Sequence, residues 1–297
     1  MVSVDRPASS SRATRRAARR RKAPVVYFVL GVLVLLAPVV LTQVKNQEQY
    51  EFAEQYSRSV AQIDAGEKQE ILRRAHEYNG RLPEVGARDP WVTGPDVTSE
   101  AYRDYLTQLN MDSTMARIRV PSVGIDMPVH HGTSQKTLAA GVGHLYGTAL
   151  PIGGDGSHAV LTGHTGLATM TMFDSVHHIK HGDIMIVEVM GEELAYRVDE
   201  ITVVLPDEID GVRPEAGHDR LTLVTCTPYG INTHRLLVRG ERTELPSREI
   251  TQEFHTIWQP WMLAAIVISL AALLYLLWWL RRNRRDNETE PEGGRTR

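Results

Sequence analysis

The chain has 297 residues, of which 42% are hydrophobic, and a formal net charge of −3 at pH 7. Its ends are basic: residues 1–22 and 281–297 carry +7 and +2, which leaves −12 on the chain between them. An acidic middle portion is repelled by a phosphate backbone, so we expect no nucleic-acid partner. The single cysteine, Cys226, excludes an internal disulfide and leaves reactivity, metal binding or simple burial to account for it.

Two uncharged apolar stretches, residues 25–41 and 261–280, are long enough to enter a lipid bilayer. Arginine-rich segments precede the first and follow the second, and such basic flanks stay on the cytoplasmic side. The first stretch is longer than the apolar core of a cleaved signal peptide, and no small-x-small cleavage pattern follows it. We therefore expect a multi-pass protein of the cell membrane whose middle portion is extracellular. The expected segments are a basic cytoplasmic tail over 1–24, a transmembrane helix or uncleaved signal anchor over 25–44, a second transmembrane helix over 258–280 and a cytoplasmic tail over 281–297.

The outward portion divides into a polar part over residues 45–114 and a β-rich part over 115–257. Within 45–78, apolar positions at helical spacing predict two helices with a break near Asp64. Glycine and proline predict a loop over 80–98, after which Ser99 can cap a short helix. From Met115 onward, short alternating runs separated by turn signals predict a closed β-barrel or a sandwich. The runs are 115–120, 123–129, 159–163, 184–190, 193–198, 200–205, 220–226 and 234–239.

The last two runs flank a turn-rich segment and give Cys226 a specific neighbour. If they pair as an antiparallel hairpin, Cys226 can lie opposite Arg235, with Val224 opposite Leu237. A guanidinium beside a thiol favours the thiolate, which is the nucleophilic form. The alternatives are an outward-facing Arg235 unrelated to the thiol, and a Cys226 that is only a small buried apolar residue.

A thiolate nucleophile needs a partner for proton transfer, and His164 is the best candidate among the 12 histidines. It follows the run 159–163 at a bend that contains Gly163 and Gly166. His177, His178 and His181 raise the alternative of a metal site, but their spacing lacks a convincing set of partner ligands. We expect neither a metal nor a cofactor.

The stretch Thr222–Leu236, TLVTCTPYGINTHRL, resembles the active-site segment of class C sortases, the pilin-polymerising transpeptidases of Gram-positive bacteria. Leu161–His164 resembles the segment that carries the catalytic histidine of this family, and residues 141–151 resemble its upstream pattern. The resemblance covers about residues 50–257. It implies a mainly β fold, the sortase eight-stranded β-barrel over 115–257 with N-terminal helices before it. It also implies that Cys226, His164 and Arg235 are the catalytic set.

One further motif resembles the lid of pilus sortases: Asp89, Pro90 and Trp91, within the expected loop. By this resemblance Asp89 would contact Arg235, and Trp91 would cover Cys226 until substrate displaces the loop. The alternative is an ordinary Asp-Pro turn with an exposed aromatic residue.

The function implied by the resemblance is transpeptidation through a thioester. The donor would be an LPXTG-like sorting signal of a pilin or surface protein, and the acceptor a lysine amine of a second pilin. One alternative is a sortase that anchors proteins to peptidoglycan. Another is a non-enzymatic membrane-anchored surface protein, but Leu245–Glu249 before the apolar tail lacks the Thr-Gly of a sorting signal. A thiol redox protein would need a second, resolving cysteine.

Overall fold

The computed structural model describes residues 10–82, 95–111, 113–166, 170–206, 208, 212–246 and 258–288. The chain forms two compact units, Met1–Leu41 together with Trp258–Arg297, and Thr42–Ile257. Within the described residues, two helices are long and apolar enough to cross a membrane, Pro24–Ala61 and Pro260–Arg282. Most of their apolar side chains are exposed, unlike those of a helix in a soluble core.

The helices follow the predicted pattern with two differences, the unbroken course of α1 and a short helix over Gln135–Ala140 that was not predicted. Helix α1 runs from Ser10 to Ala61 without a break, so the apolar stretch and the polar segment after it form one helix that includes Pro38. Helix α2, Ala65–Asn79, begins after Asp64, whose carboxylate accepts a hydrogen bond from the N–H of Gly66 as an N-cap. The remaining helices are α3 (Glu100–Thr107), α4 (Gln135–Ala140) and α6 (Pro260–Glu288), with short 3₁₀ turns at Pro121–Val123 and Val176–His178.

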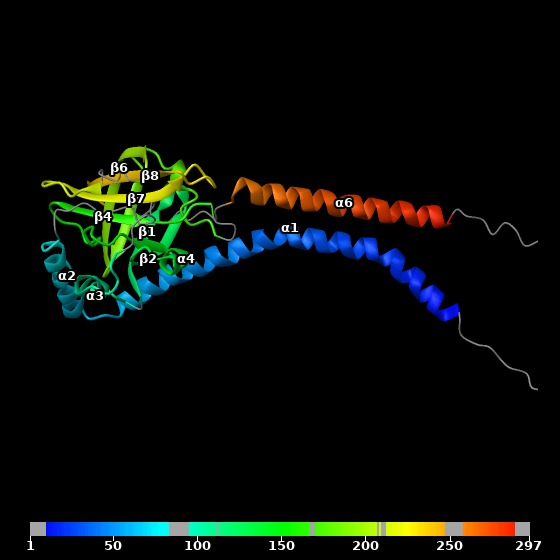
Figure 1. The fold of residues 1–297 in the computed structure, drawn as a ribbon, viewed down its shortest axis with the longest axis horizontal. Coiled ribbons are helices and arrows are strands. Elements are labelled where there is room, and N and C mark those ends of the chain that lie inside the picture. The colour runs from blue at the N-terminus through cyan, green and yellow to red at the C-terminus, as the bar shows by residue number, and fades with distance from the viewer. Residues whose placement is uncertain are drawn as a thin grey trace, which may run out of the picture. The chain divides into compact units, whose positions relative to one another are not determined.

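The strands close into a barrel in the order β1-β2-β3-β4-β7-β8-β6-β5. Figure 1 shows β6, β8 and β7 side by side in this barrel. Closure confirms the predicted eight-stranded barrel and leaves no unpaired sheet edge. Most neighbours are antiparallel, but β2–β3 and β4–β7 are parallel. The strands are β1 (Thr114–Val120), β2 (Ile125–His131), β3 (Val142–His144), β4 (Ser157–Thr162), β5 (Ile184–Val189), β6 (Glu192–Val204), β7 (Asp219–Thr227) and β8 (His234–Thr243).

Two strand predictions need correction. The runs 193–198 and 200–205 are one strand, β6, in which the pairing with β8 shifts register between Val198 and Glu200. A bulge of this kind interrupts the alternation of apolar residues, which explains why the sequence suggested two strands. Strand β3 escaped detection because it has only three residues and lies between Gly141 and Leu145, where no alternating pattern can be read.

The main core fills the barrel and extends under the later part of α1. The hydroxyl of Tyr56 in α1 donates to the carbonyl of Met115 at 3.1 Å and accepts from the N–H of Met190 at 3.0 Å. Arg117 of β1 and Asp126 of β2 form a buried ion pair, with Nε to Oδ1 at 2.6 Å and Nη2 to Oδ2 at 2.5 Å. The Tyr56 bonds fix the end of α1 against β1 and the residue that follows β5, and the ion pair joins β1 to β2.

A second apolar cluster covers the outer face of β4, β7 and β8. It consists of Leu145, Val160, Val212, Val224 and Leu237, with the half-buried Val204 of β6 packed against it. Side chains alternate between the two faces of a strand, so Leu223 faces the barrel interior while Val224 and Cys226 share the outer face. The candidate site therefore lies on the outside of the barrel, at the end of this second cluster.

Candidate active site

Cys226 and Arg235 are directly opposite each other in the β7–β8 ladder, and Val224 is opposite Leu237. Both pairings confirm the register that the sequence predicted. The two site residues are buried, at 9% and 5% relative exposure. Nη1 of Arg235 donates to the carbonyl oxygens of Asn232 and His234 at 3.4 and 3.2 Å, which directs the guanidinium along the hairpin loop.

The loop between β7 and β8 turns back sharply because two of its N–H groups donate hydrogen bonds to the carbonyl oxygen of one proline. The N–H groups of Ile231 and Asn232 both donate to the carbonyl oxygen of Pro228, at 3.0 and 2.9 Å. Gly230 and Asn232 adopt positive φ angles of 73° and 61°, a conformation that glycine and asparagine tolerate best. The sequence Pro-Tyr-Gly-Ile-Asn thus sets the return of the chain that brings Arg235 opposite Cys226.

His164 reaches the same end of the barrel from β4. Strands β4 and β7 are parallel, and their last pair is Thr162 with Val224. The N–H of Gly163 then donates to the carbonyl of Val224 at 3.2 Å, so the two chains continue side by side beyond the ladder. Since parallel strands advance in step, His164 and Cys226 each stand two residues past that last pair. The structure brings the two predicted residues to the same end of the barrel.

The loop that carries His164 rests on the core. A Cβ atom at Gly163 would lie 2.7 Å from two ring carbons of Phe173, a side chain with no exposed surface. The N–H of Phe173 donates to the carbonyl of His164 at 3.0 Å. Burial lowers the pKa of the half-buried His164 below its usual 6.5, which favours the neutral imidazole that can accept a proton.

Asp174 is a buried carboxyl near the site that the sequence analysis did not single out. Its Oδ1 accepts a hydrogen bond from the N–H of Gly166 at 2.7 Å. Burial raises the pKa of Asp174 from 3.8 to about 6, although the Gly166 bond and the neighbouring hydroxyl of Tyr229 oppose that rise. No motif identifies Asp174 as a site residue. The one feature of the sequence that points to it is its place immediately after the apolar pair Met172-Phe173.

The other predicted features lie elsewhere. Asp89, Pro90 and Trp91 fall outside the described residues, so the lid stays a prediction. The rings of His177 and His178 are tilted against each other with centroids 4.1 Å apart, and no group of three His, Cys, Asp or Glu side chains within the described ranges is placed to hold a metal ion.

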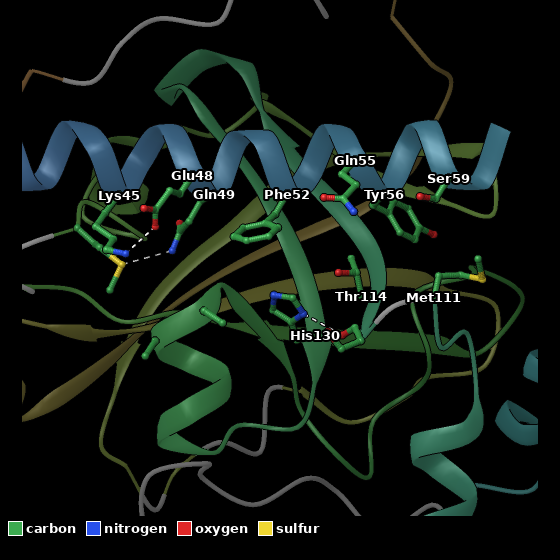
Figure 2. Close-up of a pocket in the computed structure, with 14 residues that line it drawn as sticks. Lys45, Glu48, Gln49, Phe52, Gln55, Tyr56, Ser59, Met111, Thr114 and His130 are labelled. Atoms are coloured by element: carbon green, nitrogen blue, oxygen red, sulfur yellow. Dashed lines mark hydrogen bonds and ion pairs between the residues drawn. The ribbon is translucent and has the colours of Figure 1, made fainter. Parts of the chain in front are cut away.

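A cavity of about 440 Å³ lies between the later part of α1 and the facing residues Met111, Thr114 and His130 (Figure 2). Phe52 projects from α1 into this space. Neither Cys226, His164 nor Arg235 lines the cavity, so it is separate from the candidate active site.

Comparison with known proteins identifies the class to which this barrel and site belong. The family model described as the sortase domain matches residues 118–243. Sortase C-1 from Actinomyces oris is 47% identical, with a TM-score of 0.58 over 60% of this chain and 99% of that one. Sortase A from Corynebacterium diphtheriae is 40% identical, with a TM-score of 0.61 over 68% of this chain and 95% of that one.

Sortase C from Streptococcus pneumoniae is 36% identical, with a TM-score of 0.60 over 66% of this chain and 97% of that one. A curated relative, Sortase A of Bacillus anthracis, is 29% identical over 45% of this chain, and the match spans 61% of that relative's length. The chain belongs to the sortase family of cysteine transpeptidases.

Proposed function

We propose that this protein is a class C sortase that joins pilin subunits at the outer face of the cell membrane. The observation that carries the proposal is the pairing of Cys226 with Arg235, together with the position of His164 after β4 at the same end of the barrel. The similarity to sortase C-1 of Actinomyces oris supports class C. The solved structure of the Streptococcus pneumoniae sortase C concerns pilin substrate specificity, which supports a pilin as the donor here.

In the first step Cys226 attacks a sorting signal of the LPXTG type. Neutral His164 takes the proton of the thiol, and the thiolate adds to the carbonyl carbon of threonine in the signal. Arg235 positions the signal or stabilises the negative oxygen of the tetrahedral intermediate. As the intermediate collapses, the C–N bond breaks, the amine leaves with the proton from His164, and a thioester to Cys226 remains.

In the second step the lysine amine of another pilin attacks the thioester. A C–N isopeptide bond forms, the C–S bond breaks, and the proton released by the amine returns through His164 to the sulfur. A docked amine gains over water because it is held near the carbonyl carbon. None of these steps needs a cofactor.

The two apolar helices give this reaction its expected location. Arginine-rich segments flank both on the side away from the barrel sequence, and the positive-inside rule keeps them in the cytoplasm. The unit Thr42–Ile257 would then face outward, where pilin subunits emerge.

A second candidate function is the anchoring of surface proteins to peptidoglycan. The specific observation in its favour is the similarity to sortase A of Corynebacterium diphtheriae, which is as close in fold as the class C structures. The acylation step is shared, so the two functions differ only in the amine that accepts the acyl group.

The test uses the full chain in detergent micelles, mixed with an LPXTG-type peptide and with a candidate pilin. We expect a thioester adduct on Cys226 by mass spectrometry, and a lysine-linked pilin dimer. Cys226→Ala should abolish both products, and His164→Ala should reduce turnover strongly while the matched control His178→Ala, at an exposed histidine, leaves it unchanged. An adduct of undiminished yield in Cys226→Ala would refute the proposed nucleophile. Transfer to a peptidoglycan amine without any pilin dimer would favour wall anchoring instead.

A further inference from the structure

Asp174 lies between the two loops that carry the candidate active site, with only 2% of its surface exposed. On one side it accepts a hydrogen bond from the N–H of Gly166, two residues after His164, at 2.7 Å. On the other side lies the hydroxyl of Tyr229, which favours the charged form of the carboxyl and belongs to the loop joining Cys226 to Arg235. One carboxylate therefore links the histidine segment to the cysteine–arginine hairpin.

The two loops also approach each other closely where this link occurs. A Cβ atom added to Gly166 would lie 3.3 Å from the backbone nitrogen of Gly230 and 4.0 Å from the ring of Tyr229. Gly166 has a φ of 81°, a left-handed conformation that other residues adopt with strain. A side chain at this position would push the loops apart, so Gly166 permits the approach and Asp174 maintains it.

The backbone of Asp174 is fixed by a tight turn. The N–H of Asp174 donates to the carbonyl of Thr171 at 2.7 Å, and the preceding residue, Phe173, is buried in the core. Thr171 is in turn attached to α1, because its N–H and its hydroxyl both donate to Oδ1 of Asn46 at 3.1 Å. Asp174 thus projects from a segment fixed both to the core and to α1.

We propose that Asp174 is a positioning residue of the transpeptidase, which holds the loop of His164 and the loop of Tyr229 in the relative position that proton transfer requires. This inference rests on the proposed function, in which Cys226 and His164 exchange a proton. Such an exchange needs the two groups within hydrogen-bond reach, and a displacement of about 1 Å can cost on the order of a hundredfold in rate.

The electrostatics agree with a role beyond packing. Burial disfavours the ionised carboxylate and raises the pKa of Asp174 to about 6. At neutral pH the folded protein therefore keeps a buried carboxylate ionised, which costs stability. Costs of this kind concentrate at functional sites.

The experiment compares Asp174→Ala, Asp174→Asn and Tyr229→Phe in the full chain, with steady-state cleavage of a sorting-signal peptide as the readout. Asp174→Ala should lower kcat about tenfold or more while KM changes less than about twofold, since only positioning for the chemical step is lost. Asp174→Asn keeps an acceptor oxygen of the same size for Gly166 and should recover part of kcat. Adding Tyr229→Phe to Asp174→Ala should cause no further loss, because both changes remove the same link.

The matched control is Asp155→Ala. Asp155 accepts a hydrogen bond from the N–H of Gly217 at 2.8 Å, the same kind of contact, but at the opposite end of β4 and β7. Its removal should leave kcat within twofold of the unchanged protein. Each rate is divided by the fraction of folded chains, measured by near-ultraviolet circular dichroism, because the buried Cys226 reacts with thiol reagents in unfolded chains as well.

A second readout needs no substrate. With ¹³C-labelled histidine, the ring signal of His164 should shift and broaden in Asp174→Ala and stay in place in Asp155→Ala. An Asp174→Ala protein with unchanged kcat per folded chain and an unchanged His164 signal would overturn the inference. If the unchanged protein forms no thioester with any sorting-signal peptide, the proposed function fails, while the His164 signal still tests the link itself.

Discussion

The contact between Gly163 and Phe173 predicts that a single methyl group will damage both the core and the candidate site. In Gly163→Ala the new Cβ would lie 2.7 Å from two ring carbons, whereas carbon atoms in contact normally stay about 3.5–4.0 Å apart. The ring or the loop must therefore move by roughly 0.8 Å or more. Phe173 has no exposed surface, and overpacking a closed core costs about 1–3 kcal/mol.

For a unit of this size, a loss of about 2 kcal/mol corresponds to a fall in Tm of about 4–8 °C. The assay is thermal unfolding of the full chain in detergent, followed by circular dichroism. Peptide cleavage should fall as well, because the N–H of Phe173 is bonded to the carbonyl of His164. The control Gly80→Ala adds a methyl group where φ is −66° and where the closest contact is a backbone oxygen at 3.5 Å, so it should leave Tm nearly unchanged.

The double variant Gly163→Ala with Phe173→Leu separates crowding from other effects. A smaller side chain makes room for the methyl group, so the double variant should lose less stability than the sum of the two single losses. Strictly additive losses, or an unchanged Tm in Gly163→Ala alone, would refute the packing argument.

Three further outcomes follow from the described contacts. Asp126→Asn should destabilise the chain by up to about 3–5 kcal/mol in chemical unfolding, because it leaves the buried, charged Arg117 with only its longer ion pair to Glu188 at 3.8 Å. His144 is fully buried, and burial lowers its pKa from 6.5 to about 4. Because the unfolded chain binds the proton at a higher pH than the folded chain, about 3 kcal/mol of stability should be lost as the pH falls from 6.5 to 4. His144→Gln should lessen this loss. Arg235→Lys should lower peptide cleavage at least about tenfold because it loses the planar fork, whereas Arg239→Lys, at a partly exposed ion pair, should not; equal effects would reduce Arg235 to a structural role.

The sequence was sufficient to predict the features that rest on short-range pattern. The alternating runs on both sides of the Pro-Tyr-Gly turn fixed the hairpin register, so the pairing of Cys226 with Arg235 could be predicted before the fold was known. The helix break near Asp64 and the N-cap at Ser99 were likewise readable, because each depends on residues within one turn of the chain.

Features that depend on residues distant in sequence could not be predicted. The parallel pairing of β4 with β7, which brings His164 to Cys226, joins strands separated by β5 and β6 and leaves no local mark in the sequence. The link through Asp174 depends on the burial of its neighbours and on two loops meeting, neither of which a motif encodes. The short β3 and the bulge in β6 were missed because each breaks the alternation on which strand prediction relies.

The parallel course of β4 and β7 has a consequence for how such chains can diverge. Between Thr162 and Asp219 the backbone has to travel back along the barrel, and it does so through β5, β6 and their connections. Insertions or deletions in those connections change the number of residues between the imidazole and the sulfur. They do not change how far His164 lies beyond the end of β4 or where Cys226 lies in β7. Relatives with very different spacing can therefore preserve the same chemistry, and alignments are best anchored on the two strand ends rather than on linear distance.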